Sequence, residues 1–544
     1  MNDDSYDDLN HDSDDDSIVY FPRRYNVSFE TSREDEHFNT DSDGQNSDTD
    51  PEDMEEFGQV NLAKLKSLRE EFNWENEQER YPFYLRLSKL MRSWRGNLPN
   101  LRDIFRDKEI DYFLSEAIIN RKRTNENYRG RFLVKFVFRT GYRDKPELNE
   151  DGKPSLRRTT AVHRAGDTDD SDMILRYLFK IYNRFDVNYA NESGYTHFHV
   201  ACKYGRDDVV KEFLELGQDP NCLWTETGDS PLHLALSTMF YDGWAKETIK
   251  LLLRSGVDLN WANKEGLTPL HMICKSCNNR TSGDLANTFF EITDANHQTI
   301  QIDAKDNLGR TPLQLAVASL LPYVVDVLLD RGADLSSFVF PSENYFGEQW
   351  QRDEYDESNS HLQLVSSVLT VVERLEKRGY ELDRSDALTI MKFFDKRGLF
   401  KTLVNLDEYL SGKEKYVRLA KKIMFIPSLS FYDLIHLPSK EVEKILTYEN
   451  IHEFVRSNID FFFHKRRSYG CATHLSEMIA RRFLRSWALE HLLELTRHYH
   501  LPLLCCDIII KKLANQDLMN ICFVVTDQSK DLRTKDKTWA SLFY

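Results

Sequence analysis

A phrase close to Thr-Pro-Leu-His recurs five times between residues 160 and 314. The copies are Thr160-Ala161-Val162-His163, Thr196-His197-Phe198-His199, Ser230-Pro231-Leu232-His233, Thr268-Pro269-Leu270-His271 and Thr311-Pro312-Leu313-Gln314. Their first residues are separated by 36, 34, 38 and 43 positions. A period of about 33 residues is typical of chains built from stacked helix pairs, in which each unit buries its apolar face against the next. The sequence therefore predicts a solenoid.

Each position of the phrase has a structural role. Thr or Ser accepts a hydrogen bond from a free backbone N–H at the start of a helix, and Pro fits the first helical position. A glycine stands two residues before four of the five caps, where a tight turn favours positive φ. We expect the following signature residues to be structural: Thr196, His199, Pro231, His233, Thr268, Pro269, His271, Thr311 and Pro312.

This unit of turn, helix, helix and turn resembles the ankyrin repeat. Asp258-Leu259-Asn260 and Gly332-Ala333-Asp334-Leu335 resemble the closing phrase of that repeat. The resemblance covers residues 155–338 and implies about five repeats, of which the first carries Ala161 in place of Pro and the last carries Gln314 in place of His. We therefore expect an all-α fold, an ankyrin solenoid of helix pairs with β-hairpin or turn fingers, flanked by helical domains.

The charge of the chain is unevenly distributed. The formal net charge of the 544 residues is −17, and residues 1–56 alone hold 20 Asp and Glu against three Arg. A segment with so few apolar residues cannot bury enough surface to offset chain entropy, so we expect a disordered acidic tail. The tail either solubilises the chain or is modified by kinases, with Ser13 and Ser47 as candidates because acidic residues follow them.

Composition and periodicity divide the rest of the chain. Helical spacing predicts an N-terminal cap region at 57–154 and, after the repeats, a polar loop at 339–361. A helical connector at 362–430 and a helical C-terminal domain at 431–544 follow. The chain begins without a leader and has no apolar run long enough for a membrane span, and its eight cysteines form no disulfide framework. These features favour a cytoplasmic or nuclear protein without membrane contact.

The motifs of catalysis are missing from the sequence. There is no phosphate-binding loop, no nucleophile elbow and no zinc-protease motif. Cys274 and Cys277 with His271 could form half of a zinc site, but no second pair of ligands has suitable spacing. We expect no catalytic residue, no cofactor, no metal, no small-molecule substrate and no nucleic-acid partner. An unfamiliar enzyme within residues 360–500 remains an alternative.

A second pattern lies at the C-terminus. Leu501-Pro502 opens a predicted helix with Ile508, Ile509 and Leu513 along one face, and Asn515-Gln516-Asp517-Leu518 breaks it and starts another. This hairpin at 501–525 resembles the F-box. Its position after ankyrin repeats resembles the PRANC domain of the poxvirus-type ankyrin proteins, a family expanded in parasitoid insects. Segments 431–435, 482–489 and 156–160 carry the same resemblance.

The resemblance implies a role. F-box helices dock on the Skp adaptor of a cullin-RING ubiquitin ligase, while the attached repeats hold a substrate. On this analogy the adaptor-binding surface is formed or shaped by Leu501, Pro502, Ile508, Ile509, Leu513, Asp517 and Leu518. Leu504, Cys505 and Cys506 depart from the family pattern. The alternative is an ankyrin scaffold or a competitive inhibitor of a signalling protein, in which this hairpin only packs on its neighbours.

We expect protein partners on the concave face of the solenoid and at its finger tips. Tyr189 and Trp261 each follow the Asn of a closing phrase, and Trp224 lies three residues past Asn221. Such aromatic residues are either binding hot spots or contacts between neighbouring fingers. Further finger candidates are Glu192, Glu226, Lys264 and Asn307.

Overall fold

The computed structural model describes residues 51–123, 127–168, 172–238, 245–275, 279–351, 357–401, 405–458, 469–496 and 501–524. It divides into a small unit, residues 51–60 with 95–97, and a large unit that holds the other described residues. Most of the predicted acidic tail, residues 1–50, lies outside the described residues. Helix α1 (Pro51–Glu70) includes the last six residues of the predicted tail and has proline at its first helical position.

The helices before the repeats share an aromatic core within the large unit. They are α2 (Glu77–Arg92), the 3-10 turn η1 (Leu101–Asp103), α3 (Asp107–Arg123) and α4 (Asn127–Arg139). Helix α4 packs on both α2 and α3. The rings of Phe72 and Phe83 stack 4.3 Å apart, and Phe113 lies 5.5 Å from Phe83. Aromatic burial of this kind supplies most of the packing energy of a small helical region.

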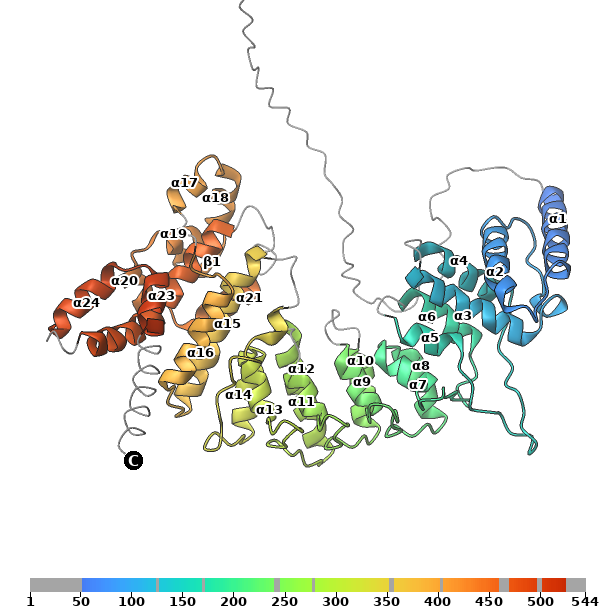
Figure 1. Cartoon of the computed structure of the whole chain (residues 1–544), viewed down its shortest axis with the longest axis horizontal. Helices are drawn as coiled ribbons and strands as arrows, with labels where there is room; N and C mark the ends of the chain where they lie inside the picture. The colour runs from blue at the N-terminus through green and yellow to red at the C-terminus, as the bar shows by residue number, and fades with distance from the viewer. Residues whose placement is uncertain are drawn as a thin grey trace, which may run out of the picture. The chain divides into compact units, whose positions relative to one another are not determined.

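Five consecutive helix pairs follow, and the predicted all-α solenoid is confirmed (Figure 1). Each first helix packs on the first helix of the next pair, from α5 to α13. The second helices from α8 to α14 pack in the same order. The pairs are α5 (Ala161–Gly166) with α6 (Asp172–Ile181), α7 (His197–Lys203) with α8 (Asp207–Glu215), α9 (Pro231–Ser237) with α10 (Lys246–Arg254), α11 (Pro269–Cys274) with α12 (Asn279–Ala295), and α13 (Pro312–Ala318) with α14 (Pro322–Asp330).

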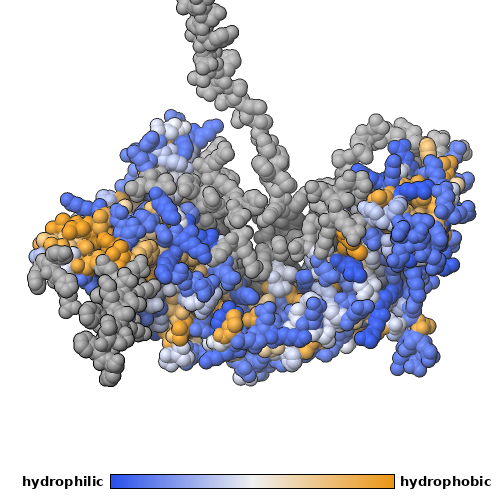
Figure 2. All heavy atoms as spheres, in the orientation of Figure 1, coloured by the Kyte–Doolittle hydropathy of each residue, from blue (hydrophilic) through white to orange (hydrophobic). Residues whose placement is uncertain are grey.

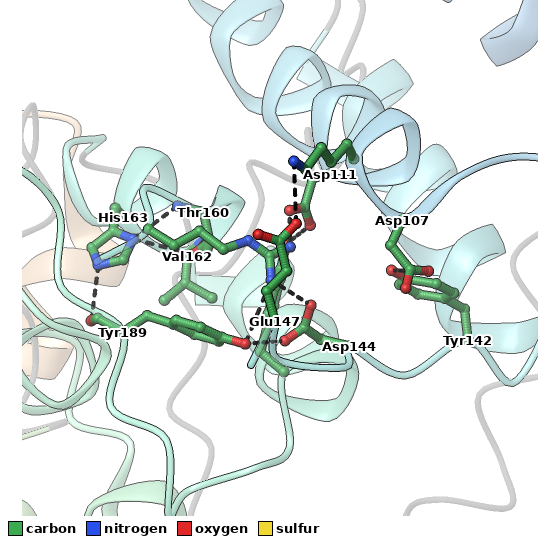
Figure 3. Close-up of polar contacts among 12 residues, drawn as sticks. Asp107, Asp111, Tyr142, Asp144, Glu147, Thr160, Val162, His163 and Tyr189 are labelled. Carbon is green, nitrogen blue, oxygen red and sulfur yellow. Dashed lines mark hydrogen bonds and ion pairs between the residues drawn. The ribbon is translucent and has the colours of Figure 1, made fainter. Parts of the chain in front are cut away.

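A buried polar network joins the N-terminal helices to the first pair. The guanidinium of Arg158 pairs with Asp111 of α3 and, at 3.0 Å, with the buried Asp144. The Tyr189 hydroxyl donates to Asp144 at 2.6 Å, and the Tyr182 hydroxyl donates to Asp111 at 2.6 Å. Figure 3 shows Asp144 and Tyr189 pointing toward one another below Asp111. These charge-assisted bonds fix the first repeat on the cap region, because the buried Asp144 and the half-buried Asp111 share the Arg158 cation.

The C-terminal half continues in helices that pack on the last repeat. The elements are η2 (Glu348–Gln351), α15 (Glu357–Lys377), α16 (Arg384–Lys396), α17 (Leu406–Leu410), α18 (Glu414–Ala420), α19 (Phe431–His436), α20 (Ser439–Ile445), α21 (Tyr448–Ser457), α23 (Tyr469–Leu495) and α24 (Leu503–Lys512). Helix α15 packs on α14, α21 and α23. The Arg374 guanidinium of α15 pairs with Asp326 of α14 and lies 4.8 Å from the centre of the Tyr323 ring.

Three details differ from the sequence prediction. Strands β1 (Met424–Ile426) and β2 (Leu429–Ser430) form a small antiparallel hairpin within the stretch expected to be entirely helical. The predicted polar loop after residue 338 buries Phe340 and Phe346, so part of it belongs to the core. The second helix of the C-terminal hairpin spans 515–524, which places the break at 513–514 and makes Asn515–Leu518 helical rather than a turn.

Candidate protein-binding sites

The signature histidines link each repeat to the next. In four repeats the N-cap backbone N–H donates to the Nδ1 atom of the histidine, at 3.0 Å for His163 and 3.1 Å for His199. Their Nε2 atoms therefore carry the proton, and each donates it to a backbone carbonyl ahead of the next repeat, such as Cys222 O at 3.1 Å from His199 and Leu267 O at 2.9 Å from His233. Each signature histidine thus joins the N-cap of its own helix to the next repeat by two hydrogen bonds. We call this pair of bonds the staple.

The last repeat makes the same link without a histidine. Gln314 accepts from the Thr311 N–H at 2.9 Å through Oε1 and donates from Nε2 to the Val339 carbonyl at 2.9 Å. An amide offers one acceptor and one donor at about the spacing of the two imidazole nitrogens. The departure at Gln314 therefore preserves the staple and removes its titratable group.

Burial keeps these imidazoles neutral. Desolvation lowers the pKa of His163 and of His199 to about 4. It also lowers the pKa of His233 and of His271, although their carbonyl partners oppose the shift. Neutral rings suit the observed bonds because Nδ1 must accept.

Neighbouring fingers are tied together along the edge of the solenoid. The Trp224 Nε1–H donates to Ser193 Oγ at 3.0 Å, and the Trp261 Nε1–H donates to the Gly228 carbonyl at 3.0 Å. Asn307 continues the series, since its Nδ2 donates to the Lys264 carbonyl at 2.7 Å. The indole N–H groups therefore hold each finger against the previous one. Only the outer faces of the two indole rings are left to contact a partner protein.

The structure separates the predicted finger residues into two groups. Tyr189 is only 2% exposed and bonds to Asp144, so of its two alternatives the binding hot spot is excluded. Trp224 is half-buried against Tyr195, with ring centres 4.5 Å apart, and Trp261 is 39% exposed. Glu192, Glu226, Lys264 and Asn307 all lie exposed at the tips. Sequence reasoning missed Leu308, which is 74% exposed beside Asn307.

Helix α24 has one buried and one exposed apolar face. Cys506 and Ile510 are buried in α24, which packs on α23, and Leu518 and Met519 of the following helical segment are also buried. Four large apolar side chains of α24 are exposed: Leu503 at 59%, Leu504 at 69%, Ile508 at 47% and Ile509 at 40%. Leu504 and Ile508 lie on the side of the helix opposite Cys506 and Ile510, and Leu503 is exposed at the first position of the helix. We call these four residues the α24 face. Figure 2 shows apolar surface gathered at the position that α24 has in Figure 1.

The residues predicted for adaptor binding differ in how exposed they are. Pro502, the N-cap of α24, is exposed together with Ile508 and Ile509, and Asp517 is exposed on the next helical segment. Leu501 and Leu513 are half-buried. Leu518 is fully buried, so it shapes the hairpin and cannot touch a partner. Sequence reasoning missed Leu503 and treats Leu504 as a departure from the family pattern, although both side chains are exposed.

The hairpin is anchored by polar contacts at its rear. Arg481 of α23 donates to the carbonyls of Lys511 at 3.0 Å and Leu513 at 2.8 Å and to Asn515 Oδ1 at 3.2 Å. Arg485 pairs with Asp507 of α24 at 3.7 Å. These contacts fix the break between the helices and leave the α24 face turned outward.

Other kinds of site find little support among the described residues. No group of three or more His, Cys, Asp or Glu side chains in the described parts of the chain could hold a metal ion. Cys274 of the suspected half site is buried in the apolar core, where desolvation raises the pKa of its thiol. Cys277 falls outside the described residues. No helix within the described ranges is long and apolar enough to cross a membrane.

Comparison with known proteins identifies the repeats. A family model of ankyrin repeats in three copies matches residues 232–338, and a second ankyrin model matches residues 181–235. Residues 181–338 are therefore ankyrin repeats, a module that generally binds other proteins without catalysis.

Similarity to curated proteins is local. SMC5-SMC6 complex localization factor protein 1 from Bos taurus is 33% identical over 126 residues, which cover 23% of this chain and 11% of that protein. Neurogenic locus notch homolog protein 1 from Mus musculus is 30% identical over 148 residues, 27% of this chain and 5% of that protein. Alpha-latrotoxin-Lh1a from Latrodectus hasselti is 27% identical over 136 residues, 24% of this chain and 10% of that protein. The chain thus spans about a tenth or less of the length of these relatives.

Proposed function

We propose that this chain is a non-catalytic receptor with two protein-binding surfaces. The finger edge of the ankyrin array holds a partner protein. The α24 face docks on the Skp adaptor of a cullin-RING ubiquitin ligase, so that the bound partner is presented for ubiquitination. Such a receptor works in the cytoplasm or nucleus, and its own residues perform no bond chemistry, because bringing two bound proteins together raises their effective concentration.

The exposed α24 face is the observation that carries the adaptor proposal. Leu504 and Ile508 are four residues apart, as are Cys505 and Ile509, so they form one apolar stripe along a helix. A helix that buries one face and exposes a second apolar face is suited to docking in a hydrophobic groove. Because residues 501–525 resemble the F-box, we propose that this groove is the one on the Skp adaptor.

The finger edge supports the partner-binding half of the proposal. Trp261 and Leu308 expose apolar surface at neighbouring tips, 39% and 74% respectively, among the charged tip residues Glu226 and Lys264. Aromatic and apolar anchors with a polar rim are the usual composition of a binding hot spot. The fingers are held by the indole and histidine bonds, so little ordering is needed when a partner binds.

Direct binding of the purified full-length chain to purified Skp adaptor tests the ligase link. The double variant Ile508→Asp, Ile509→Asp removes two exposed anchors, and each central anchor contributes about 2 kcal/mol in typical interfaces. We expect binding by the unaltered chain and loss of binding by the variant. The matched control is Leu419→Asp, which alters a 46% exposed leucine on α18.

The alternative is a scaffold or competitive inhibitor with no ligase link. In that case the unaltered chain does not bind the adaptor, and deletion of residues 500–544 leaves the cellular level of the bound partner unchanged. If the double variant still bound the adaptor, the α24 face would not be the adaptor-binding surface.

A further inference from the structure

A basic and aromatic surface covers the outer side of α4 and its two neighbours. Helix α4 contains four basic residues and no acidic one. Arg131, Lys135 and Phe138 follow one another at helical spacing, and Phe132 and Arg139 flank them on the same side. All five side chains are exposed or half-buried. This helix therefore presents alternating cations and rings to solvent.

Helices α2 and α6 extend the surface on both sides of α4, on which both pack (Figure 1). Arg92 of α2 lies 5.4 Å from the centre of the Phe132 ring. Lys180 of α6 lies 5.6 Å from the Phe138 ring, and Arg143 lies 5.1 Å from the same ring. We call the set Lys89, Arg92, Arg131, Phe132, Lys135, Phe138, Arg139, Arg143 and Lys180 the α4 basic surface.

The cations of this surface lack neutralising partners. Other cations of this N-terminal region are paired, for example Arg69 of α1 with Glu109 of α3 at 2.5 Å and Arg86 of α2 with Glu71 at 2.8 Å. Among the described residues, no carboxylate lies within ion-pair distance of Lys89, Arg92, Arg131, Lys135, Arg139, Arg143 or Lys180. Seven cations with no carboxylate partner among the described residues create a positive potential that attracts a polyanion.

Two properties favour an acidic polypeptide over nucleic acid as the occupant. The rings of Phe132 and Phe138 already hold cations, so their faces are not free for the base stacking on which single-strand binding depends. The chain also carries 17 net negative charges at its N-terminal end, which repel a nucleic-acid backbone.

We propose that the α4 basic surface binds the acidic N-terminal segment of this same chain, residues 1–50. The segment holds 16 Asp and Glu against three Arg, and it is tethered to α1 of the region it would cover. An extended chain of 50 residues reaches up to about 170 Å, so length does not limit the contact. Tethering gives the segment an effective concentration on the order of millimolar, which allows many weak ion pairs to act together.

Carbodiimide cross-linking of the full-length chain tests this contact, because the reagent joins a carboxylate to a lysine amine only when the two touch. We expect cross-links from residues 1–50 at Lys89, Lys135 and Lys180. The exposed lysines Lys246, Lys305 and Lys396 serve as matched controls on other helices and fingers. The cross-links should be lost at high salt, which screens exposed charges.

Two variants and one mixing experiment make the test decisive. Replacing Asp12, Asp14, Asp15 and Asp16 by Asn should reduce the cross-links, and Lys89→Glu, Lys135→Glu, Lys180→Glu should remove the segment from the surface without changing helix content. Equal cross-linking at the control lysines would overturn the proposal. Cross-links found only between isotopically distinct copies would overturn the intrachain contact, as would nucleic acid bound at this surface in the purified protein.

Discussion

The Nε2–H of His233 donates a 2.9 Å hydrogen bond to the backbone carbonyl of Leu267, 34 residues later in the chain. The same ring accepts from the Ser230 backbone N–H at 3.4 Å and from the Ser230 hydroxyl at 2.8 Å. One side chain therefore starts its own helix and ties the following finger in place. The recurring phrase is a set of such staples, and the position of each finger beside the next depends on them.

Substitution of His233 should reveal the staple. His233→Ala leaves the Ser230 N–H buried without a partner, at a cost of about 1–3 kcal/mol. It also removes the link to the Leu267 carbonyl, which keeps only its bond from the Asn263 N–H at 3.0 Å. His233→Gln should cost much less, because Gln314 makes the same two bonds in the last repeat. Native-state hydrogen exchange of the α9 and α11 amides measures the difference. If both variants lost the same amount of protection, the two hydrogen bonds of His233 would not contribute to the stability of the repeats.

The array should lose stability in mild acid. The pKa of a free imidazole is about 6.5, whereas His163 and His199 have a pKa of about 4 in the fold. Between these values the unfolded chain binds more protons, so the free energy of unfolding falls as pH falls through this window and is unchanged above it.

Each such histidine contributes about 3 kcal/mol to the loss when the window is crossed completely. The measurement is the free energy of unfolding of the array between pH 7.5 and 4.5. His199→Gln should flatten the dependence by removing one titrating group. A slope identical to that of the unaltered chain would contradict the assignment of the histidines as buried neutral groups.

The close approach of neighbouring fingers can be tested at glycine. Gly266 has φ +79° and a Cβ there would lie 2.6 Å from the Asn307 backbone N, whereas Gly256 has φ +81° with nothing within 4 Å of a Cβ. Both alanine variants carry the left-handed strain of about 1 kcal/mol. Gly266→Ala should be clearly more destabilising in urea unfolding, because the finger of Asn307 must also move. Equal destabilisation would show that the fingers are not in close contact.

Arg158 should be essential for joining the cap region to the first repeat. Arg158→Met leaves the buried carboxylate of Asp144 without its cation, and breaking a buried pair in this way costs about 3–5 kcal/mol. We expect faster hydrogen exchange in α5 and α6 and no change in α13. Arg184→Met, which breaks an exposed pair with Asp186, is the control and should cost little. Unchanged exchange in α5 and α6 would contradict the role of the network.

The solenoid could be predicted from sequence because its signals are local. A cap, a proline and a histidine within four residues determine a helix start, and a period near 33 residues implies stacking. Strands β1 and β2 were missed because segments of three and two residues carry no periodicity. The Arg158 network could not be predicted, since its partner Asp111 lies 47 residues away and only packing brings them together.

The candidate sites were less predictable because exposure depends on neighbours. Tyr189 and Trp261 follow the same closing phrase, yet Tyr189 faces Asp144 of the cap region while Trp261 faces Gly228 of the previous finger. Similarly, the pattern of α24 indicates an apolar helix but not which residues α23 covers. Within α24, Cys506 is buried and Leu504 is exposed.

Affinity purification of the full-length chain from cells, read by quantitative mass spectrometry, tests the two-surface account most directly. Three forms are compared: the unaltered chain, Ile508→Asp with Ile509→Asp on the α24 face, and Trp261→Asp with Leu308→Asp at the finger tips. We predict that the α24 variant loses the Skp adaptor and cullin but keeps the array's partner, and that the finger variant shows the opposite pattern. Recovery of adaptor and cullin by the α24 variant at the level of the unaltered chain would contradict the account.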